Sequence, residues 1–271
     1  MSVPADLHIH STASDGQYTP SEIVALAKAK GLEAIALTDH DTLGGLEEAM
    51  AAGRAQGLRV IPGIELSADD CLNLHILGYA FSPEAPALVE MTGSMKKGRN
   101  ERKYRIAEFL KTRGMDVPLS EVEAAAGGGV IGRPHFAQVM LRHGMVSTRR
   151  EAFDLYLDTP EFQEMEKGAK PSARKCVEAV KAAGGKVSLA HPYQIVLGKG
   201  NLEELVKRLK GDGLDAMECH YPRHTPQQTS AYLALAKKYG LHVTGGSDFH
   251  GEQQKPDHLL TAWELELDWL L

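Results

Sequence analysis

The sequence has few cysteines and no long apolar run. Its three cysteines, Cys71, Cys176 and Cys219, stand apart and form no CxxC pair, which argues against a disulfide framework and a thiolate metal site. No segment approaches the roughly 20 apolar residues that a transmembrane helix needs, and no signal peptide opens the chain. We therefore expect a cytoplasmic protein that does not bind membranes.

The sequence also lacks an excess of positive charge. Its net charge of −6 argues against a protein that coats duplex DNA. The charge is uneven, because the stretch from Lys96 to Arg150 carries twelve Lys and Arg residues against five Asp and Glu. Such a stretch is either a set of solvated helix faces or a positive field for an anionic substrate.

The 271 residues are enough for one large α/β domain with a full hydrophobic core. Short apolar segments alternate with helical patterns, which is typical of a parallel sheet built from βα units. The expected strands are Ala5–His10, Ala34–Thr38, Arg59–Glu65, Leu74–Phe81, Lys186–Ala190, Ala216–His220 and His242–Gly245.

The alternation stops between Gly98 and Lys167. Four helical patterns follow one another there, at Arg99–Arg113, Leu119–Ala126, Pro134–His143 and Thr148–Leu157. We therefore predict that residues 98–167 form a helical insertion or cap domain. Residues 1–97 and 168–271 would form the α/β body.

Polar side chains that can bind metals follow most of the expected strands. His8 and His10 point to the same face of the first strand, because side chains alternate with a period of two. Asp15 follows in the next loop. Other strand ends carry His40, Glu65, His191, Asp248 and His250, and the expected strand Leu74–Phe81 carries His75. In a (β/α) barrel the carboxyl ends of the strands form the face that holds the active site.

These six histidines and three acids predict a metal centre. A single histidine after a strand is commonly structural, but a buried cluster of this kind needs cations to offset its cost. Nine ligands exceed the usual three of one catalytic metal and predict two or three divalent ions. Imidazole and carboxylate without thiolate suit Mn²⁺, which we favour, or Fe²⁺ or Zn²⁺. Clustered metals about 4 Å apart suit in-line displacement at phosphorus.

The order of these motifs resembles the PHP family of polymerase-and-histidinol-phosphatase phosphoesterases. The similarity extends along the chain through His8-Ile9-His10, Thr38-Asp39-His40-Asp41, Gly63-Ile64-Glu65, Ala190-His191-Pro192 and Gly246-Ser247-Asp248-Phe249-His250. The resemblance implies a distorted seven-stranded, TIM-like (β/α) barrel with a cluster of usually three metal ions. It implies ligand sets of His8, His10, Glu65 and Asp248 for one ion, Glu65, His75 and His191 for a second, and Asp15, His40 and His250 for the third.

The insertion and the segment Gly132-Arg133-Pro134-His135 resemble one subgroup, the 3′,5′-nucleoside bisphosphate phosphatases. Some members of that subgroup also trim RNA from the 5′ end. Arg133 offers a planar fork for bidentate phosphate binding, and His135 is a possible second donor. The alternative for this segment is a turn followed by a helix-start proline. The resemblance implies catalytic roles for Arg133, His135, His191 and Asp248.

Further contacts to a nucleotide are expected outside this segment. Arg174 and Lys175 are candidates for binding a distal phosphate, as are Arg223 and His224, which follow an expected strand. Tyr221 is a candidate for stacking on a base, although a loop aromatic is more often only packed.

We expect activated water to attack the 3′-phosphorus in line, without a phosphoenzyme, and release a 5′-nucleotide and phosphate. The residue that protonates the leaving group stays open between His191, His224 and a metal-bound water. The expected partners are a small nucleotide or the 5′ end of a short RNA, with no obligate protein partner.

Three alternatives have the same kind of site. A histidinol-phosphate phosphatase needs only one phosphate-binding site. An amidohydrolase also places histidines and metals in a (β/α) barrel, often with a carbamylated lysine, but no lysine stands at a matching strand end here. A non-enzymatic PHP module of a larger polymerase is disfavoured by the full ligand set and by the expected absence of further domains.

Overall fold

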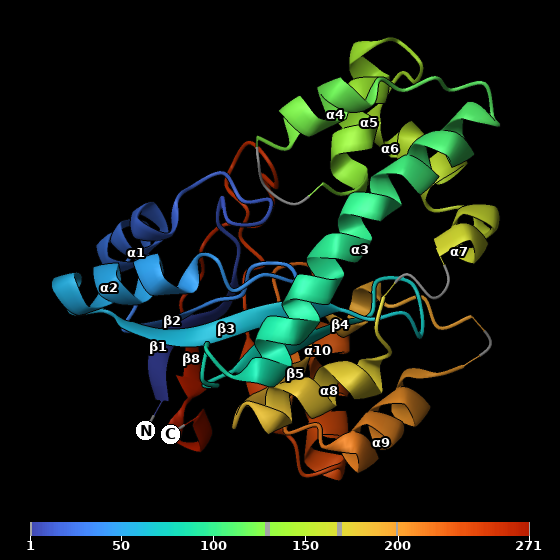
Figure 1. Cartoon of the computed structure of the whole chain (residues 1–271). Helices are drawn as coiled ribbons and strands as arrows, with labels where there is room; N and C mark the ends of the chain where they lie inside the picture. Colours follow the sequence, from blue (N-terminus) through green and yellow to red (C-terminus); the bar gives the residue numbers. More distant parts are fainter. Residues whose placement is uncertain (1, 128–130, 167–169, 199, 271) are drawn as a thin grey trace. The chain divides into compact units, whose positions relative to one another are not determined.

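The computed structural model describes residues 2–127, 131–166, 170–198 and 200–270 (Figure 1). The chain separates into two compact units, one made of Met1–Thr92 with Pro171–Leu271 and the other of Gly93–Lys170. We call them the barrel unit and the helical unit, and describe each by itself. The sequence placed the insertion at residues 98–167, and its predicted end at Lys167 lies outside the described residues.

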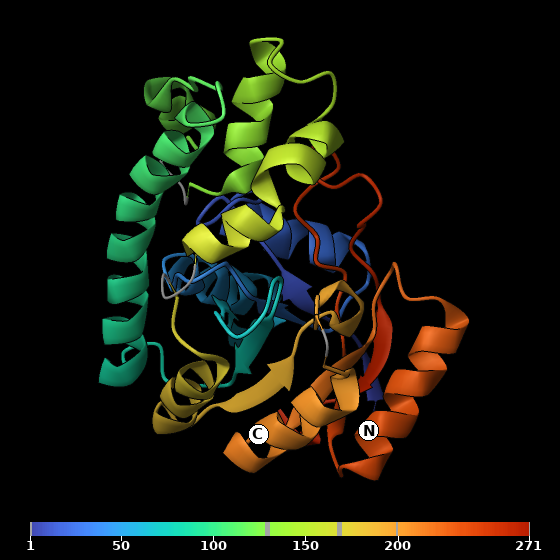
Figure 2. The same ribbon diagram turned by 90° about the vertical axis from the view of Figure 1, so that its right-hand side faces the viewer.

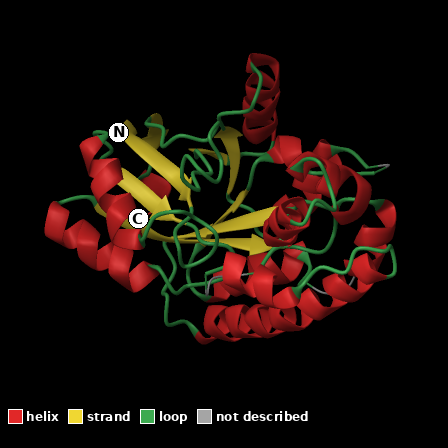
Figure 3. Cartoon of the chain, turned by 90° about the horizontal axis from the view of Figure 1, so that it is seen from above, coloured by secondary structure: helices red, strands yellow, loops and turns green. Residues whose placement is uncertain are grey.

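The barrel unit is built on one eight-stranded sheet. Figure 3 shows its strands from above, and their order is β7-β6-β5-β4-β3-β2-β1-β8. The strands are β1 (Ser2–Ile9), β2 (Ala34–Leu37), β3 (Arg59–Ser67), β4 (His75–Tyr79), β5 (Lys186–Leu189), β6 (Ala216–His220), β7 (His242–Gly245) and β8 (Trp263–Glu266). The seven expected strands are present, and the prediction missed β8.

A nearly closed barrel results, because the first strand also meets the segment that follows β7. Ile9 and Phe249 form a parallel bridge, in which the backbone N–H of His10 donates to the Phe249 carbonyl at 2.9 Å. The buried carboxylate of Asp6 accepts hydrogen bonds from the backbone N–H groups of Ser247 and Thr261 at 2.9 and 3.1 Å. One side chain of β1 therefore holds the two ends of the loop that joins β7 to β8.

The expectation of an all-parallel sheet is wrong at two strands. β4 runs antiparallel to both β3 and β5, and β8 runs antiparallel to β1. His75 begins β4, as it nearly began the expected strand Leu74–Phe81, and it lies opposite Ser67 at the end of β3. Because an antiparallel strand starts at the edge where its parallel neighbours end, His75 still reaches the face that carries the other predicted ligands.

The helices of the barrel unit are α1 (Pro20–Ala29), α2 (Leu46–Gln56), α8 (Ala173–Ala182), α9 (Leu202–Asp212) and α10 (Pro226–Lys238). Thr19 and Thr225 each cap a helix N-terminus and complete a capping box, with Glu22 and Gln228 as the third helical residues. The two ends of the chain lie on the same side of the barrel (Figures 1 and 2), as the pairing of Ser2 with Glu266 requires.

The helical unit has its own hydrophobic core. Its elements are the greater part of α3 (Pro86–Lys111), then α4 (Leu119–Ala125), α5 (Arg133–Arg142), α6 (Arg149–Ala152), a π-helical turn (Phe153–Leu157) and α7 (Pro160–Glu166). Leu110, Phe136, Met140 and Phe162 are buried together at its centre. Among the described residues, none of the helices has the length and apolar character to span a membrane.

Candidate metal centre

The nine predicted metal ligands lie in one cluster at one end of the barrel. His8 belongs to β1 and His10 follows it, Asp15 stands in the next loop, and His40 follows β2. Glu65 lies in β3 and His75 begins β4, while His191 follows β5 and Asp248 and His250 follow β7. Three groups within this cluster bring their ligand atoms within 4.8 Å of one another: His8, His10, Glu65 and Asp248; His10, Asp15, His40 and His250; and His40, Glu65 and His75.

Glu65 is the centre of the cluster. Its buried carboxylate meets imidazole nitrogens of five histidines: Oε2 lies 3.2 Å from His8, 3.2 Å from His10 and 3.0 Å from His40, and Oε1 lies 2.7 Å from His75 and 2.9 Å from His191. A single carboxylate with several imidazoles at each oxygen is well placed to bridge two cations.

Two aspartates flank His10 and His250. Oδ1 of Asp248 lies 3.3 Å from His10 Nε2, and Oδ1 of Asp15 lies 3.4 Å from His250 Nε2. The rings of His10 and His250 stack with their centroids 4.0 Å apart. His191 and Asp248 both have positive φ angles, of 23° and 52°, a backbone conformation that residues other than glycine adopt mainly where surrounding contacts fix it.

The donor set fits divalent cations. Several buried atoms of the cluster have no hydrogen-bond partner among the described residues: Nε2 of His8, both ring nitrogens of His10, Nδ1 of His40, Oε2 of Glu65 and Nδ1 of His191. Each buried polar atom left unsatisfied costs about 1–3 kcal/mol. A cation bonded to these nitrogens and oxygens would satisfy most of them at once, so the residues fit the metals that the sequence predicted.

The cluster divides its histidines into two electrostatic classes. Burial lowers the pKa of His75 to about 3 and that of His250 to about 4, so both rings are neutral at pH 7 and ready to bind a metal. Burial opposes protonation of His10 as well, but Asp248 and Glu65 outweigh it and raise its pKa to about 9. Burial of Glu65 alone would raise its pKa, but the surrounding histidines outweigh this effect and hold that pKa well below its usual range.

Glu218, a residue that the sequence analysis missed, supports the cluster from β6. Its buried carboxylate lies 3.0 Å from His8 Nδ1 and also accepts a hydrogen bond from the backbone N–H of His191 at 2.6 Å. A carboxylate that binds the far nitrogen of a histidine fixes the ring so that the other nitrogen faces the metal. Asp39 stabilises the loop before Asp15. Its carboxylate accepts hydrogen bonds from the backbone N–H of Ser11 at 2.7 Å and from the hydroxyl of Ser14 at 2.6 Å.

The structure does not support base stacking by Tyr221. The side chain is only 3% exposed, and its hydroxyl donates to Asp248 Oδ2 at 2.7 Å and accepts from Gln194 at 2.6 Å. A buried ring has no free face for a base, so this residue holds the carboxylate of Asp248 instead. The sequence already offered the alternative of a packed loop aromatic.

The other residues proposed from sequence to bind a distal phosphate lie in different surroundings. Arg174, on α8, pairs with Glu178 at 3.0 Å and Asp212 at 3.6 Å, and its neighbour Lys175 is exposed. Among the described residues neither makes a contact with the cluster. Arg223 is exposed, and His224 directs Nδ1 at the Cys219 carbonyl at 3.0 Å.

Arg133 and His135 open helix α5 of the helical unit. Arg133 forms an ion pair with Asp158, and it is half-buried. His135 Nδ1 accepts a hydrogen bond from the backbone N–H of Gly132 at 2.9 Å, which caps the helix. The turn and helix start that the sequence left open as an alternative are therefore present. They place two basic side chains at one helix N-terminus.

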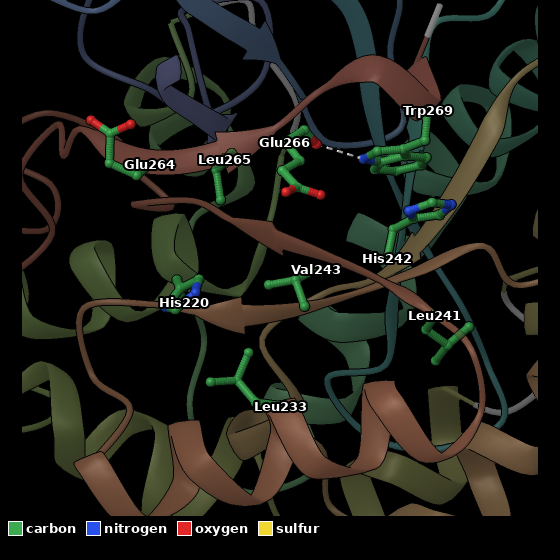
Figure 4. Close-up of a pocket in the computed structure, with 9 residues that line it drawn as sticks. All are labelled: His220, Leu233, Leu241, His242, Val243, Glu264, Leu265, Glu266 and Trp269. Atoms are coloured by element: carbon green, nitrogen blue, oxygen red, sulfur yellow. Dashed lines mark hydrogen bonds between the residues drawn. The ribbon is translucent and has the colours of Figure 1, made fainter. Parts of the chain in front are cut away.

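A separate cavity of about 400 Å³ lies between α10, β7 and β8 (Figure 4). His220, His242, Glu266 and Trp269 are among its lining residues, and the rings of His242 and Trp269 stack at 4.7 Å. None of the nine cluster residues lines it. This cavity is therefore not the metal centre.

Comparison with known protein families agrees with the geometry of the centre. The family model of the PHP domain matches residues 6–146, a range that includes His8, His10, Asp15, His40, Glu65 and His75. The chain belongs to the PHP family. The complete cluster and the relatives below identify this PHP protein as a metal-dependent phosphoesterase.

Three relatives with assigned activities cover most of the PHP chain. A 5′-3′ exoribonuclease of Haemophilus influenzae is 34% identical over 90% of this chain and 89% of its own. A 3′,5′-nucleoside bisphosphate phosphatase of Chromobacterium violaceum is 32% identical over 90% of this chain and 86% of its own. A phosphoribosyl 1,2-cyclic phosphate 1,2-diphosphodiesterase of Eggerthella lenta is 32% identical over 94% of this chain and 97% of its own.

A solved structure shows the same fold. A protein from Bifidobacterium adolescentis described as a metal-dependent phosphoesterase superimposes with a TM-score of 0.82 at 30% identity, covering 98% of this chain and 93% of that one. The PHP barrel expected from the sequence is confirmed. The histidinol-phosphatase and amidohydrolase alternatives are not favoured by the assigned activities of these relatives.

Proposed function

We propose that the protein hydrolyses the 3′-phosphate of nucleoside 3′,5′-bisphosphates and releases a 5′-nucleotide and phosphate. The observation that carries the proposal is the cluster of nine predicted ligands centred on Glu65, in a chain similar over most of its length to a bisphosphate phosphatase and an exoribonuclease. Both relatives are named for acting on phosphate esters of nucleotides. This shared chemistry favours a nucleotide or a short RNA 5′ end as the substrate here.

We propose that the cluster holds two or three divalent ions, since imidazole and carboxylate without thiolate suit Mn²⁺, which we favour, or Fe²⁺ or Zn²⁺. We assign His8, His10, Glu65 and Asp248 to one ion and Asp15, His40 and His250 to another, sets whose ligand atoms lie close together. Glu65 and His75 belong to the third, with His40 or His191, both of which lie within 3.0 Å of Glu65. Bound there, the ions would supply an activated water and neutralise charge on the phosphate.

Side chains of the protein would bind the phosphate groups of the substrate and protonate its leaving group. We propose that Arg133 and His135, at one helix start, donate to a phosphate group of the substrate, and that Arg133 exchanges its ion pair with Asp158 for this contact. His191 lies within the cluster, with ring Nε2 2.9 Å from Glu65 Oε1 and its backbone N–H bonded to Glu218 at 2.6 Å. With His40 completing the third set, we propose that His191 passes a proton to the leaving 3′-oxygen.

A second candidate function is hydrolysis of a cyclic phosphate diester. This chain aligns with 97% of the length of the Eggerthella relative. It aligns with 89% of the exoribonuclease and 86% of the bisphosphate phosphatase. Both reactions need a metal-activated water at phosphorus, so the centre alone does not distinguish them. The two candidate substrates differ in the part that lies outside the reacting phosphate, so the residues that bind that part would decide between them.

A substrate panel separates the candidates. Purified protein supplied with Mn²⁺ is incubated with adenosine 3′,5′-bisphosphate, adenosine 3′-monophosphate, phosphoribosyl 1,2-cyclic phosphate, histidinol phosphate and short 5′-phosphorylated RNA. Opening a cyclic diester or cleaving RNA need not release inorganic phosphate, so the products are separated by chromatography. We expect the 3′,5′-bisphosphate to be consumed fastest. Preference for the cyclic diester would establish the second candidate, and inactivity on all five would reject the proposed function.

A further inference from the structure

Lys255 places a positive charge directly beside the cluster, from the loop between β7 and β8. Its Nζ lies 2.9 Å from Oδ2 of Asp248, the carboxylate whose other oxygen faces His10 at 3.3 Å. The side chain of Lys255 is 37% exposed, whereas that of Asp248 is 3% exposed. The Lys255 side chain is therefore partly accessible to solvent, and its ammonium group contacts a buried ligand.

The backbone around Lys255 is fixed, so the position of its side chain is set by the fold. The N–H of Lys255 donates to the Gly251 carbonyl at 2.9 Å, and its own carbonyl accepts from the His258 N–H at 3.1 Å. The same loop is joined to the loop after β1, because the Gln253 N–H donates to Gln17 Oε1 at 3.1 Å. These bonds tie Lys255 to the loop that carries Asp15.

Lys255 is distinctive among the cations of the barrel unit. Among the described lysines and arginines of that unit, Lys255 forms an ion pair with a member of the cluster, Asp248. Arg208 pairs with Asp70, Lys181 with Asp215 and Lys238 with Glu203, all outside the cluster. The ammonium group of Lys255 is therefore the lysine or arginine charge next to the position that a phosphate at the metal centre would occupy.

We propose that Lys255 binds the phosphate group of the substrate at the metal centre. An ammonium group has three donors, and Asp248 accepts one of them. With one donor used by Asp248, the remaining two can bind a non-bridging phosphate oxygen through charge-assisted hydrogen bonds. The inference rests on the proposed function, because it requires that the centre take a phosphate ester.

The competing explanation is that Lys255 only holds the carboxylate of Asp248, as Tyr221 does at the same oxygen, Oδ2, at 2.7 Å. The two explanations predict different defects. A residue that only positions a metal ligand lowers metal affinity when it is removed. A phosphate-binding residue lowers phosphate affinity at full metal loading.

The experiment compares Lys255→Met, Lys255→Arg and the control Lys207→Met, which removes an exposed lysine of α9. Bound metal is measured by elemental analysis, and inorganic phosphate binding to the Mn²⁺-loaded proteins is measured by calorimetry. We expect Lys255→Met to keep its metal and to bind phosphate about 10- to 100-fold more weakly, with Lys255→Arg intermediate and the control unchanged. This readout requires no turnover.

Two results would overturn the inference. One is phosphate affinity in Lys255→Met equal to that of the unaltered protein. The other is a phosphate defect that disappears when excess Mn²⁺ restores full loading, which would make Lys255 a positioning residue for Asp248. If the unaltered protein binds phosphate through Lys255 but hydrolyses no 3′,5′-bisphosphate, the proposed function fails while the phosphate site stands.

Discussion

Oε1 of Glu218 and Nδ1 of His8 lie 3.0 Å apart inside the barrel, and neither side chain is exposed to solvent. His8 thus has one nitrogen fixed by β6 and the other, Nε2, directed at Glu65 at 3.2 Å. The same Glu218 carboxylate accepts from the His191 N–H at 2.6 Å. One residue of β6 therefore orients two of the nine predicted ligands.

Glu218→Gln should weaken metal binding about 10- to 100-fold, the usual range for loss of a residue that orients a metal-binding histidine. The amide can accept only at its oxygen, so its nitrogen would meet one of the two donors that Glu218 now binds. Metal titration of the purified variant measures the change. Glu264→Gln, an exposed residue of β8, is the matched control. Equal metal affinity in both variants would contradict the role of Glu218.

Gly246→Ala should damage the metal centre through backbone crowding. A Cβ atom at Gly246 would lie 2.1 Å from Cβ of His8 and 2.7 Å from Oε1 of Glu218, so the methyl group must displace one of them. We expect reduced metal content and a lower melting temperature. Gly211→Ala, in α9, has nothing within 4 Å of the added Cβ and should stabilise the protein by about 0.5–1 kcal/mol through helix propensity. Full metal content in Gly246→Ala would refute this packing argument.

Arg133→Ala and Asp248→Ala should fail in different ways. Arg133→Ala should retain its metal and lose about 100-fold or more in kcat/KM, as expected for one donor to the transition-state phosphate. Asp248→Ala should lose metal, because it removes a ligand from the group of His8, His10 and Glu65. Elemental analysis and steady-state kinetics distinguish the two defects. Arg142→Ala, an exposed arginine of the same helix, should behave like the unaltered protein, and loss of metal from Arg133→Ala would count against a substrate role.

Metal affinity should rise with pH. Burial lowers the pKa of His10, but Asp248 and Glu65 outweigh it and raise the pKa to about 9, so in the metal-free protein a proton occupies this ring at pH 7. A metal must displace that proton, and His10 alone should make apparent affinity about tenfold higher per pH unit below 9. His75 and His250, with pKa values near 3 and 4, add nothing in this range. Mn²⁺ titrations at pH 6.5, 7.5 and 8.5 measure the slope, and a flat profile would disprove the assignment of His10.

The sequence was most informative at the strand ends. Alternation within β1 put His8 and His10 on one face, and the barrel hypothesis brought Asp248 to them from the far end of the chain. His75 joins these ligands from the start of its strand, because β4 is antiparallel to β3. The direction of a short apolar strand has no local sequence signal, since it depends on which neighbours the strand pairs with.

The supporting residues were harder to predict. Glu218 lies inside the short strand Ala216–His220, where one sequence cannot show whether a carboxylate faces the barrel interior or the outer helices. Lys255 belongs to a loop of polar residues, and only the fold brings it to Asp248. β8 was missed because its Trp-Glu-Leu-Glu pattern is short and its two glutamates are exposed.

The most direct test of the account is the product formed from adenosine 3′,5′-bisphosphate by the Mn²⁺-loaded protein. Chromatography distinguishes adenosine 5′-monophosphate from adenosine 3′-monophosphate, and a phosphate assay gives the stoichiometry. The account predicts the 5′-monophosphate and one equivalent of phosphate, with activity lost on chelation and restored by Mn²⁺. Formation of the 3′-monophosphate, or no phosphate release from a fully metal-loaded protein, would contradict it.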